Sequence, residues 1–136
     1  MDILQQSFSG FPAFITHLLA AFVLLALFLT IYSAITPYRE IQLIREGNIA
    51  AAISLSGAMI GFAIPLAKAV AQSANLLDML MWAGIALVIQ LLVYAVARMV
   101  FPGIAKAIPE GHLAQGAFLG MLSLVSGLLN SACMTY

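Results

Sequence analysis

Four long stretches of this chain contain no ionised side chain, and the charged residues lie between or beside them. The stretches are residues 13–36, 49–67, 79–97 and 113–134. A helix rises 1.5 Å per residue, so about 20 apolar residues cross the roughly 30 Å hydrocarbon core of a bilayer. Each stretch meets or nearly meets that length. The sequence therefore predicts an all-α integral membrane protein with four transmembrane helices, surrounded by the lipid bilayer.

The composition excludes several classes of protein. Only 7% of the 136 residues are charged, against about 25% in a soluble domain, and the formal net charge is zero. A nucleic-acid partner is excluded because no basic patch can neutralise phosphates. The sequence contains no phosphate-binding loop, metal-ligand spacing or nucleophile elbow. We therefore expect a single transmembrane domain over residues 1–136, with no catalytic residues, no cofactor and no metal.

The distribution of basic residues predicts the orientation in the membrane. Short cytoplasmic loops collect Lys and Arg. The segments that join the first span to the second and the third to the fourth hold Arg39, Arg45, Arg98 and Lys106, whereas the other side holds only Lys68. We expect both segments to face the cytoplasm and both termini to lie outside, in the periplasm. The expected location is the bacterial inner membrane.

The two cytoplasmic segments resemble each other. Residues 44–50, Ile-Arg-Glu-Gly-Asn-Ile-Ala, are similar to residues 108–114, Ile-Pro-Glu-Gly-His-Leu-Ala, 64 positions later. Each Glu-Gly pair directly precedes a span rich in small residues. We interpret the chain as two copies of one helical hairpin, residues 13–72 and 77–136. Both copies have the same orientation, which makes a parallel repeat.

Several segments together resemble a known family. They are residues 38–40, Tyr-Arg-Glu; the first repeated segment extended to residue 52; residues 61–67, Gly-Phe-Ala-Ile-Pro-Leu-Ala; the pair Asp78-Met79; and the ending, residues 129–136. The chain resembles the YjfL-like bacterial inner-membrane proteins, designated domain of unknown function 350, over nearly its whole length. The resemblance implies a small multi-span protein of the bacterial inner membrane, and it carries over no catalytic residue.

Two predicted helices carry stripes of small and weakly polar residues at spacings of three and four. The second span has Ser54, Gly57 and Gly61, and the fourth has Gly116, Gly120, Ser123, Gly127 and Asn130. Such a stripe lies on one helix face and lets two backbones approach closely. We call these two stripes the small-residue seams. They favour helix packing, within the protein or between protomers, and the alternative is the polar lining of a pathway.

Local patterns predict the ends of the helices and one buried hydrogen bond. Asn48 and Asn75 are expected N-caps of the second and third spans. Gln90, near the middle of the third span, must find a partner because an unpaired amide in hydrocarbon is costly, and we expect one on another helix. Residues 38–45 alternate charged and apolar side chains and predict a short amphipathic helix at the inner interface. Tyr32 and Tyr38 fit the aromatic belt there.

The best candidates for a functional site are Glu46 and Glu110, each just ahead of a Gly and a helix N-terminus. One interpretation is structural, because a carboxylate at the positive end of a helix dipole contributes about 0.3–1 kcal/mol. The other is an acidic pair at the cytoplasmic mouth that attracts cations or docks a partner, accompanied by Arg39, Arg45 and Arg98.

Two hypotheses for function follow. The first is a non-enzymatic, homo-oligomeric membrane component whose charged cytoplasmic loops dock a protein partner. The alternative is an oligomeric channel or transporter for a small ion or solute, with its path lined by the small-residue seams and Gln90. The two differ in one observation, which is whether the seams face a wet cavity or another backbone.

Overall fold

The computed structural model describes residues 2–135, which form helices and no strands. The helices are α1 (Asp2–Ser9), α2 (Phe11–Ile35), α3 (Glu40–Arg45), α4 (Ile49–Gln72), α5 (Leu76–Val100), α6 (Ile104–Ala107) and α7 (Leu113–Cys133). Within these residues, four helical segments are long and apolar enough to cross a membrane: Asp2–Ile35, Ile49–Gln72, Leu76–Val100 and Leu113–Cys133. The prediction of an all-α protein with four such helices is confirmed.

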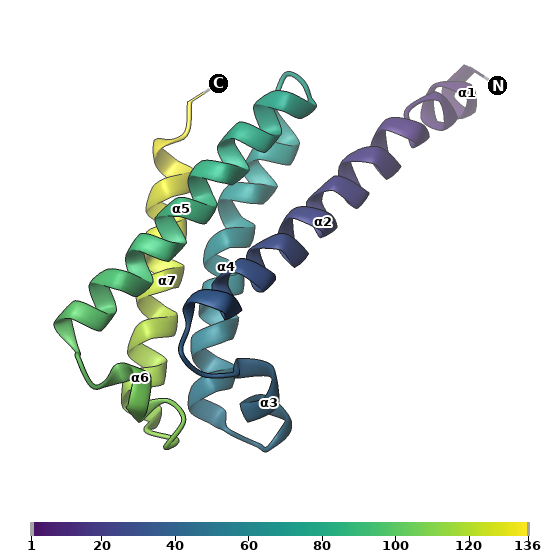
Figure 1. The fold of residues 1–136 in the computed structure, drawn as a ribbon. Helices are drawn as coiled ribbons and strands as arrows, with labels where there is room; N and C mark the ends of the chain where they lie inside the picture. The colour runs from purple at the N-terminus through teal and green to yellow at the C-terminus, as the bar shows by residue number, and fades with distance from the viewer. Residues whose placement is uncertain (1, 136) are drawn as a thin grey trace.

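The helices α4, α5 and α7 pack as a bundle, and α2 joins it from about its middle to its C-terminus (Figure 1). Towards its N-terminus α2 diverges from the other helices. The short helices α3 and α6 lie at one end of the molecule, which we call the inner end. The α4–α5 turn and both termini lie at the opposite, outer end. The core forms where α2 meets the bundle, and there the rings of Phe28 and Phe62 stack with centroids 4.5 Å apart.

Both predicted N-caps are confirmed. The side-chain oxygen of Asn48 accepts from the backbone N–H of Ala51 at 3.0 Å, and that of Asn75 accepts from Asp78 at 2.9 Å. These bonds satisfy N–H groups that a helix start leaves without partners. Asn48 also donates from its amide nitrogen to the carbonyl oxygen of Ile108 at 2.9 Å, which ties the start of α4 to the second inner segment.

The inner segments end in turns of the same geometry. Gly47 has a φ of 86° and Gly111 a φ of 80°, in the left-handed region that glycine adopts without a steric penalty. Each turn is closed by two backbone bonds of 2.9–3.0 Å: Asn48 to Leu43 and Gly47 to Ile44, then His112 to Ala107 and Gly111 to Ile108. This pattern is the Schellman ending of a helix. It places α4 and α7 so that both start at the inner end.

The outer ends of α4 and α7 are joined by a lysine. Nζ of the half-buried Lys68 donates to the carbonyl oxygens of Ser131 at 2.7 Å and Met134 at 3.1 Å. Carbonyls at a helix C-terminus lack partners within the helix and carry its negative dipole charge, so a cation there is favourable.

Candidate functional site

The small-residue seams of α4 and α7 face each other. A Cβ atom built on Gly116 would lie 2.6 Å from the carbonyl oxygen of Ala50, and one on Gly120 would lie 2.6 Å from that of Ile53. A Cβ on Gly57 would overlap the backbone of Gly120. The two backbones therefore touch, and the absence of side chains is what allows the contact.

The same backbone contact continues towards the outer end of the seams. A Cβ on Gly61 would overlap the backbone of Ser123, and one on Gly127 would overlap the backbone of Gly61. Asn130 lies half-buried near the outer end of α7. At these positions each seam faces another backbone, which is the arrangement that the packing interpretation describes.

The polar residues beside this contact bond to the protein. Gln90 is 1% exposed, and its amide nitrogen donates to the carbonyl oxygen of Ser123 at 3.1 Å. The expected interhelical bond from Gln90 is thus present, between α5 and α7. The hydroxyl of Ser54 donates to the carbonyl oxygen of Ala51 in its own helix at 3.1 Å. The Gln90 bond therefore joins two helices, whereas the Ser54 bond stays within α4.

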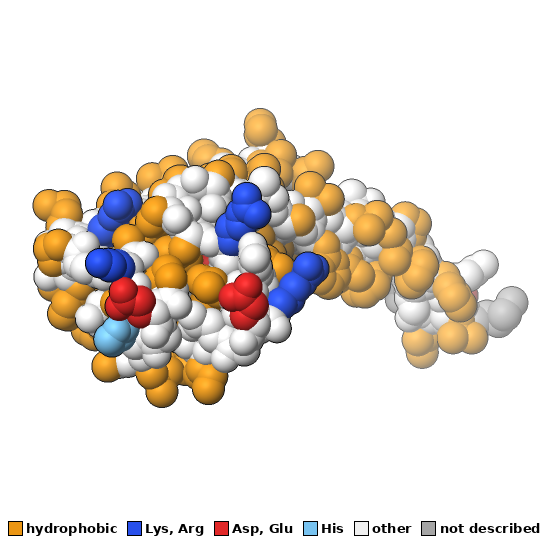
Figure 2. All heavy atoms as spheres, turned by 60° about the horizontal axis from the view of Figure 1, so that its bottom comes forward, with side chains coloured by type: hydrophobic (Ala, Val, Ile, Leu, Met, Phe, Trp, Pro, Cys, Tyr) orange, Lys and Arg blue, Asp and Glu red, His pale blue; other side chains and the backbone are white. Residues whose placement is uncertain are grey.

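Glu46 and Glu110 border the same hollow at the inner end. Both carboxylates are exposed, and both line one shallow hollow of about 460 Å³. Glu110 pairs with His112 at 3.2 Å, and Glu46 accepts from the amide of Gln42 at 3.4 Å. Figure 2 shows acidic and basic side chains gathered on this end of the molecule, around an apolar and backbone surface.

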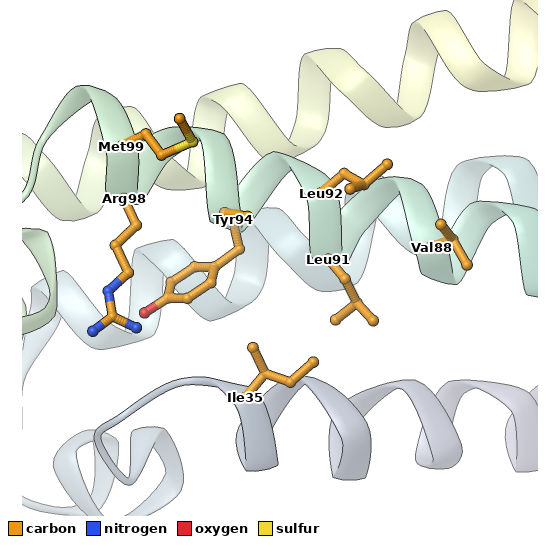
Figure 3. Close-up of a pocket in the computed structure, with 8 residues that line it drawn as sticks. Ile35, Val88, Leu91, Leu92, Tyr94, Arg98 and Met99 are labelled. Atoms are coloured by element: carbon orange, nitrogen blue, oxygen red, sulfur yellow. The ribbon is translucent and has the colours of Figure 1, made fainter.

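The basic candidates divide into two groups. Arg39 and Arg45 are exposed at the inner end, and Arg39 lines a smaller cavity that also borders Glu46. Arg98 instead lines a groove of about 720 Å³ between α5 and the end of α2, together with Tyr94 and Ile35. Its side chain and that of Tyr94 point from α5 towards α2 (Figure 3). The structure therefore does not place Arg98 in the lining of the hollow between Glu46 and Glu110.

Glu40 contradicts the expectation for the amphipathic helix. It begins α3 but is only 1% exposed, so it does not belong to a polar face at the membrane surface. Both of its carboxyl oxygens are buried without a hydrogen-bond partner among the described residues. The physical reason is tertiary, because α3 packs against α4 and its first turn faces the end of α2.

The aromatic belt expectation is also wrong for Tyr32 and Tyr38. Both side chains are buried, at 2% and 8% exposure, and so is Tyr94 of α5 at 2%. The rings of Tyr32 and Tyr94 meet edge to face with centroids 5.7 Å apart. All three hydroxyl groups lack a hydrogen-bond partner within residues 2–135. We call Glu40 with these three tyrosines the inner polar cluster.

Burial makes the Glu40 carboxyl a weaker acid. It raises the pKa of the Glu40 carboxyl above its ordinary value, because an ionised group loses its hydration inside the protein. The nearby hydroxyls of Thr36 and Ser33 favour the charged form and offset only part of this effect. The hydroxyl of Thr36 is directed to backbone carbonyls, those of Ser33 at 3.2 Å and Tyr38 at 3.3 Å.

The phenol of Tyr38 responds in the same direction. Its pKa is raised, first by burial and then by the neighbouring Tyr94, Tyr32 and Glu40. Tyr38 is therefore a neutral phenol near the Glu40 carboxyl. Within the inner polar cluster, Glu40 is the group that ionises most readily.

Sequence reasoning missed Glu40 because a charged residue beside Arg39 in a short segment is usually exposed. One signal could have found it. Position 104, which stands 64 residues after Glu40, is an isoleucine four residues before the second of the two similar segments, residues 108–114. Ile104 is fully buried in the structure. An alignment of the two segments thus pairs Glu40 with a core position.

Comparisons with known proteins agree with this architecture. The family model described as "Domain of Unknown Function (DUF350)" matches residues 6–134. The chain is 41% identical over 124 residues to the UPF0719 inner membrane protein YjfL of Escherichia coli strain K12, across 91% of this chain and 94% of that protein. It is 30% identical over 82 residues to the UPF0719 transmembrane protein YshE of Bacillus subtilis strain 168, across 60% of this chain and 61% of that protein. No solved structure matches it.

The family match covers nearly all of the four spans and both inner segments. The relatives are named as membrane proteins, and the chain itself has four helices that are long and apolar enough to cross a bilayer. The protein is therefore a multi-pass inner-membrane protein embedded in the lipid bilayer. It belongs to the DUF350 family.

Proposed function

We propose that this protein is a non-enzymatic, homo-oligomeric component of the inner membrane whose inner end docks a protein partner in the cytoplasm. The observation that carries the proposal is the shared hollow of Glu46 and Glu110. Two exposed carboxylates from separate segments border one concave surface at the end where charge gathers. Charged groups around a recognition surface steer encounter and fix register.

The partner surface that fits this hollow is basic. Glu46 and Glu110 are both exposed at its rim, so a lysine or arginine side chain can pair with either one while it remains partly hydrated. The exposed Arg39 and Arg45 nearby repel a uniformly basic surface and favour one with acidic residues at its margin. The docked segment is therefore of mixed charge with a basic centre.

The proposed orientation puts the inner end in the cytoplasm and both termini outside. Four of the five basic residues belong to the two inner segments, whereas Lys68 caps the outer end of α7. Loops rich in Lys and Arg remain on the cytoplasmic side. The hollow would then be open to cytoplasmic proteins.

The packing of the seams supports this proposal over the alternative of a channel or transporter. The path of that alternative runs along the seams of α4 and α7, where Gly57 meets the backbone of Gly120. The amide nitrogen of Gln90 likewise donates to a backbone carbonyl of α7, that of Ser123. The small residues are accounted for by helix contact, so a pathway lined by them has no supporting observation here.

The homo-oligomer rests on a different observation. The seams are used within one chain, so they do not supply the interface between copies. An apolar groove lies between α5 and the C-terminal end of α2, and Ile35, Leu91 and Leu92 line it. A helix of a second copy matches this groove in chemistry, because both surfaces are apolar and lie within the span.

Photo-crosslinking in native membranes tests the docking proposal. A photoreactive residue at the exposed Leu113, which lines the hollow, should crosslink a cytoplasmic protein. The same residue at the exposed Leu129, in the outer half of α7, should not. The double variant Glu46→Gln with Glu110→Gln should abolish the crosslink, and Asp2→Asn, which removes an exposed carboxylate at the outer end, should leave it unchanged. A crosslink that survives the double variant, or none at position 113, contradicts the proposal.

A further inference from the structure

We propose that Glu40 is a proton-binding site, in which the carboxyl holds a proton inside the protein among Tyr32, Tyr38 and Tyr94. The site is built from three elements: α2 contributes Tyr32, the segment between α2 and α3 contributes Tyr38, and α5 contributes Tyr94. Glu40 itself is 1% exposed, and neither of its oxygens has a hydrogen-bond partner among the described residues. The inference is independent of the docking proposal.

The first step is the cost of a buried charge. An ionised carboxylate without a partner loses its hydration, and the effective penalty in proteins is several kcal/mol. Protonation removes the charge, and the carboxyl then stays protonated at pH values above its ordinary pKa. A carboxyl in the position of Glu40 is therefore neutral as long as its surroundings stay closed.

The second step is the choice between a proton and a metal cation. The groove that borders Tyr94 and the cavity that borders Tyr38 do not include Glu40 in their linings. A sodium or potassium ion needs a cavity with several oxygen ligands, whereas a proton needs no volume. The close packing around Glu40 thus favours the proton.

The third step is the charge that faces the site. The phenols of Tyr32, Tyr38 and Tyr94 are neutral, and Arg98 is the cation nearest along α5, with its exposed side chain directed into the groove (Figure 3). Arg39 precedes Glu40 but is exposed. In α4, which packs against α3, the only titratable side chain is Lys68 at the outer end, and residues 49–67 contain none. No described cation is buried beside the carboxyl to replace the proton.

The location also provides a route for exchange. Tyr94 belongs to the inner polar cluster and also lines the groove that contains Arg98. Release transfers the proton from the Glu40 carboxyl to water and leaves one negative charge on α3. That charge is stable only if water reaches it or if Arg98 approaches it. The protonation state of Glu40 is thereby coupled to how α3 packs against the end of α2.

Infrared spectroscopy of the purified full-length protein in a maltoside detergent, which has no carbonyl group of its own, tests the site. A protonated carboxyl has a C=O stretching band at a frequency where ionised carboxylates do not absorb. The wild-type protein should show this band at pH 7.5, where exposed carboxyls are ionised. Glu40→Gln should remove the band. Glu46→Gln, which removes an exposed carboxylate six residues later, should keep it.

Two results would overturn the proposal. One is a wild-type spectrum at pH 7.5 without a protonated carboxyl band. The other is a band or carboxylate signal that shifts when sodium replaces a bulky organic cation, which would assign the site to a metal ion. Both results come from the wild-type protein, so they decide the matter even if Glu40→Gln fails to fold.

Discussion

Gly57 of α4 lies directly against the backbone of Gly120 of α7, so closely that a Cβ atom on Gly57 would overlap it. In a lipid environment the hydrophobic effect does not drive helices together, because the lipid tails are as apolar as the side chains. The bundle depends instead on dispersion contacts between closely approaching backbones. Contacts of this kind connect α4 with α7.

Gly57→Ala should therefore destabilise the protein by about 1–3 kcal/mol, because overpacking a close contact forces backbone shifts. A bulkier change at the facing position, Gly120→Leu, should prevent correct folding. Gly84→Ala in α5 is the matched control, since an added Cβ there meets no atom within 4 Å. It should be neutral or stabilise by up to about 1 kcal/mol. Unfolding in detergent, followed by circular dichroism, measures both; equal stabilities would refute the seam contact.

Gly47→Ala and Gly111→Ala should each destabilise the protein by about 1–2 kcal/mol. The reason is conformational, because both glycines have positive φ, while an added Cβ meets nothing within 4 Å. Gly10→Ala, at a helical φ of −82°, should change stability by less than about 0.5 kcal/mol. Similar losses at positions 47 and 111 are expected if the two turns are equivalent parts of a repeat. Chemical denaturation of the three variants in the same detergent is the measurement.

Lys68→Met should lower stability by about 1–2 kcal/mol, because the carbonyls of Ser131 and Met134 lose a charged donor. Lys106→Met removes an exposed lysine whose side chain makes no hydrogen bond among the described residues. It should stay within about 0.5 kcal/mol of the wild type. Hydrogen exchange localises the effect: Lys68→Met should speed exchange in the last turn of α7. Unchanged exchange there would exclude the capping role.

The contribution of Glu40 to the stability of the protein should fall as the pH rises above about 4.5, the ordinary pKa of the group. The folded state raises the pKa of Glu40, so it binds more protons than the unfolded state in the interval between the two pKa values. The contribution of Glu40 is fully present below the unfolded pKa and is lost as the pH passes through the folded pKa. Glu40→Gln should remove this slope, because glutamine resembles the neutral acid. Melting temperatures across pH 4–9 test it, and equal slopes in both proteins would argue against the shift.

Gln90→Leu should change stability by less than about 1 kcal/mol. Hydrogen bonds between transmembrane helices average about 0.6 kcal/mol, and leucine also relieves the buried side-chain oxygen of Gln90, which has no partner in the described part of the chain. Gln90→Ala should cost about 2 kcal/mol or more, because it leaves a cavity between α5 and α7. If the two variants lose the same stability, the hydrogen bond to Ser123 contributes more than the packing.

Local features of this fold could be predicted from local sequence. A helix cap such as Asn48 acts within three residues, and the Glu-Gly turns depend on the conformational freedom of one glycine. The faces of the seams were predictable from helical spacing, but their partners were not. Spacing places Gly57 and Gly120 on helix faces, and only the packed bundle brings those two faces together.

Glu40 marks the limit of that reasoning. Its neighbour Arg39 is exposed, yet Glu40 is buried close to Tyr94, which lies far along the chain in α5. The same long-range packing moves Tyr32 from a membrane-facing position into the core. The sequence pattern indicates which face of a helix is apolar and which is polar. It does not say which other helix covers that side.

Length and hydropathy alone determined that four helices cross a bilayer and which segments join them, because the thickness of the hydrocarbon core sets a length that the charge-free stretches either reach or do not. The tertiary structure alone decided that the seams of α4 and α7 close on each other, that Glu46 and Glu110 border one hollow, and that Glu40 is buried near three buried tyrosines. The physical reason is that transfer into lipid is a property of each segment taken separately, whereas burial of a polar side chain depends on what the other segments place around it.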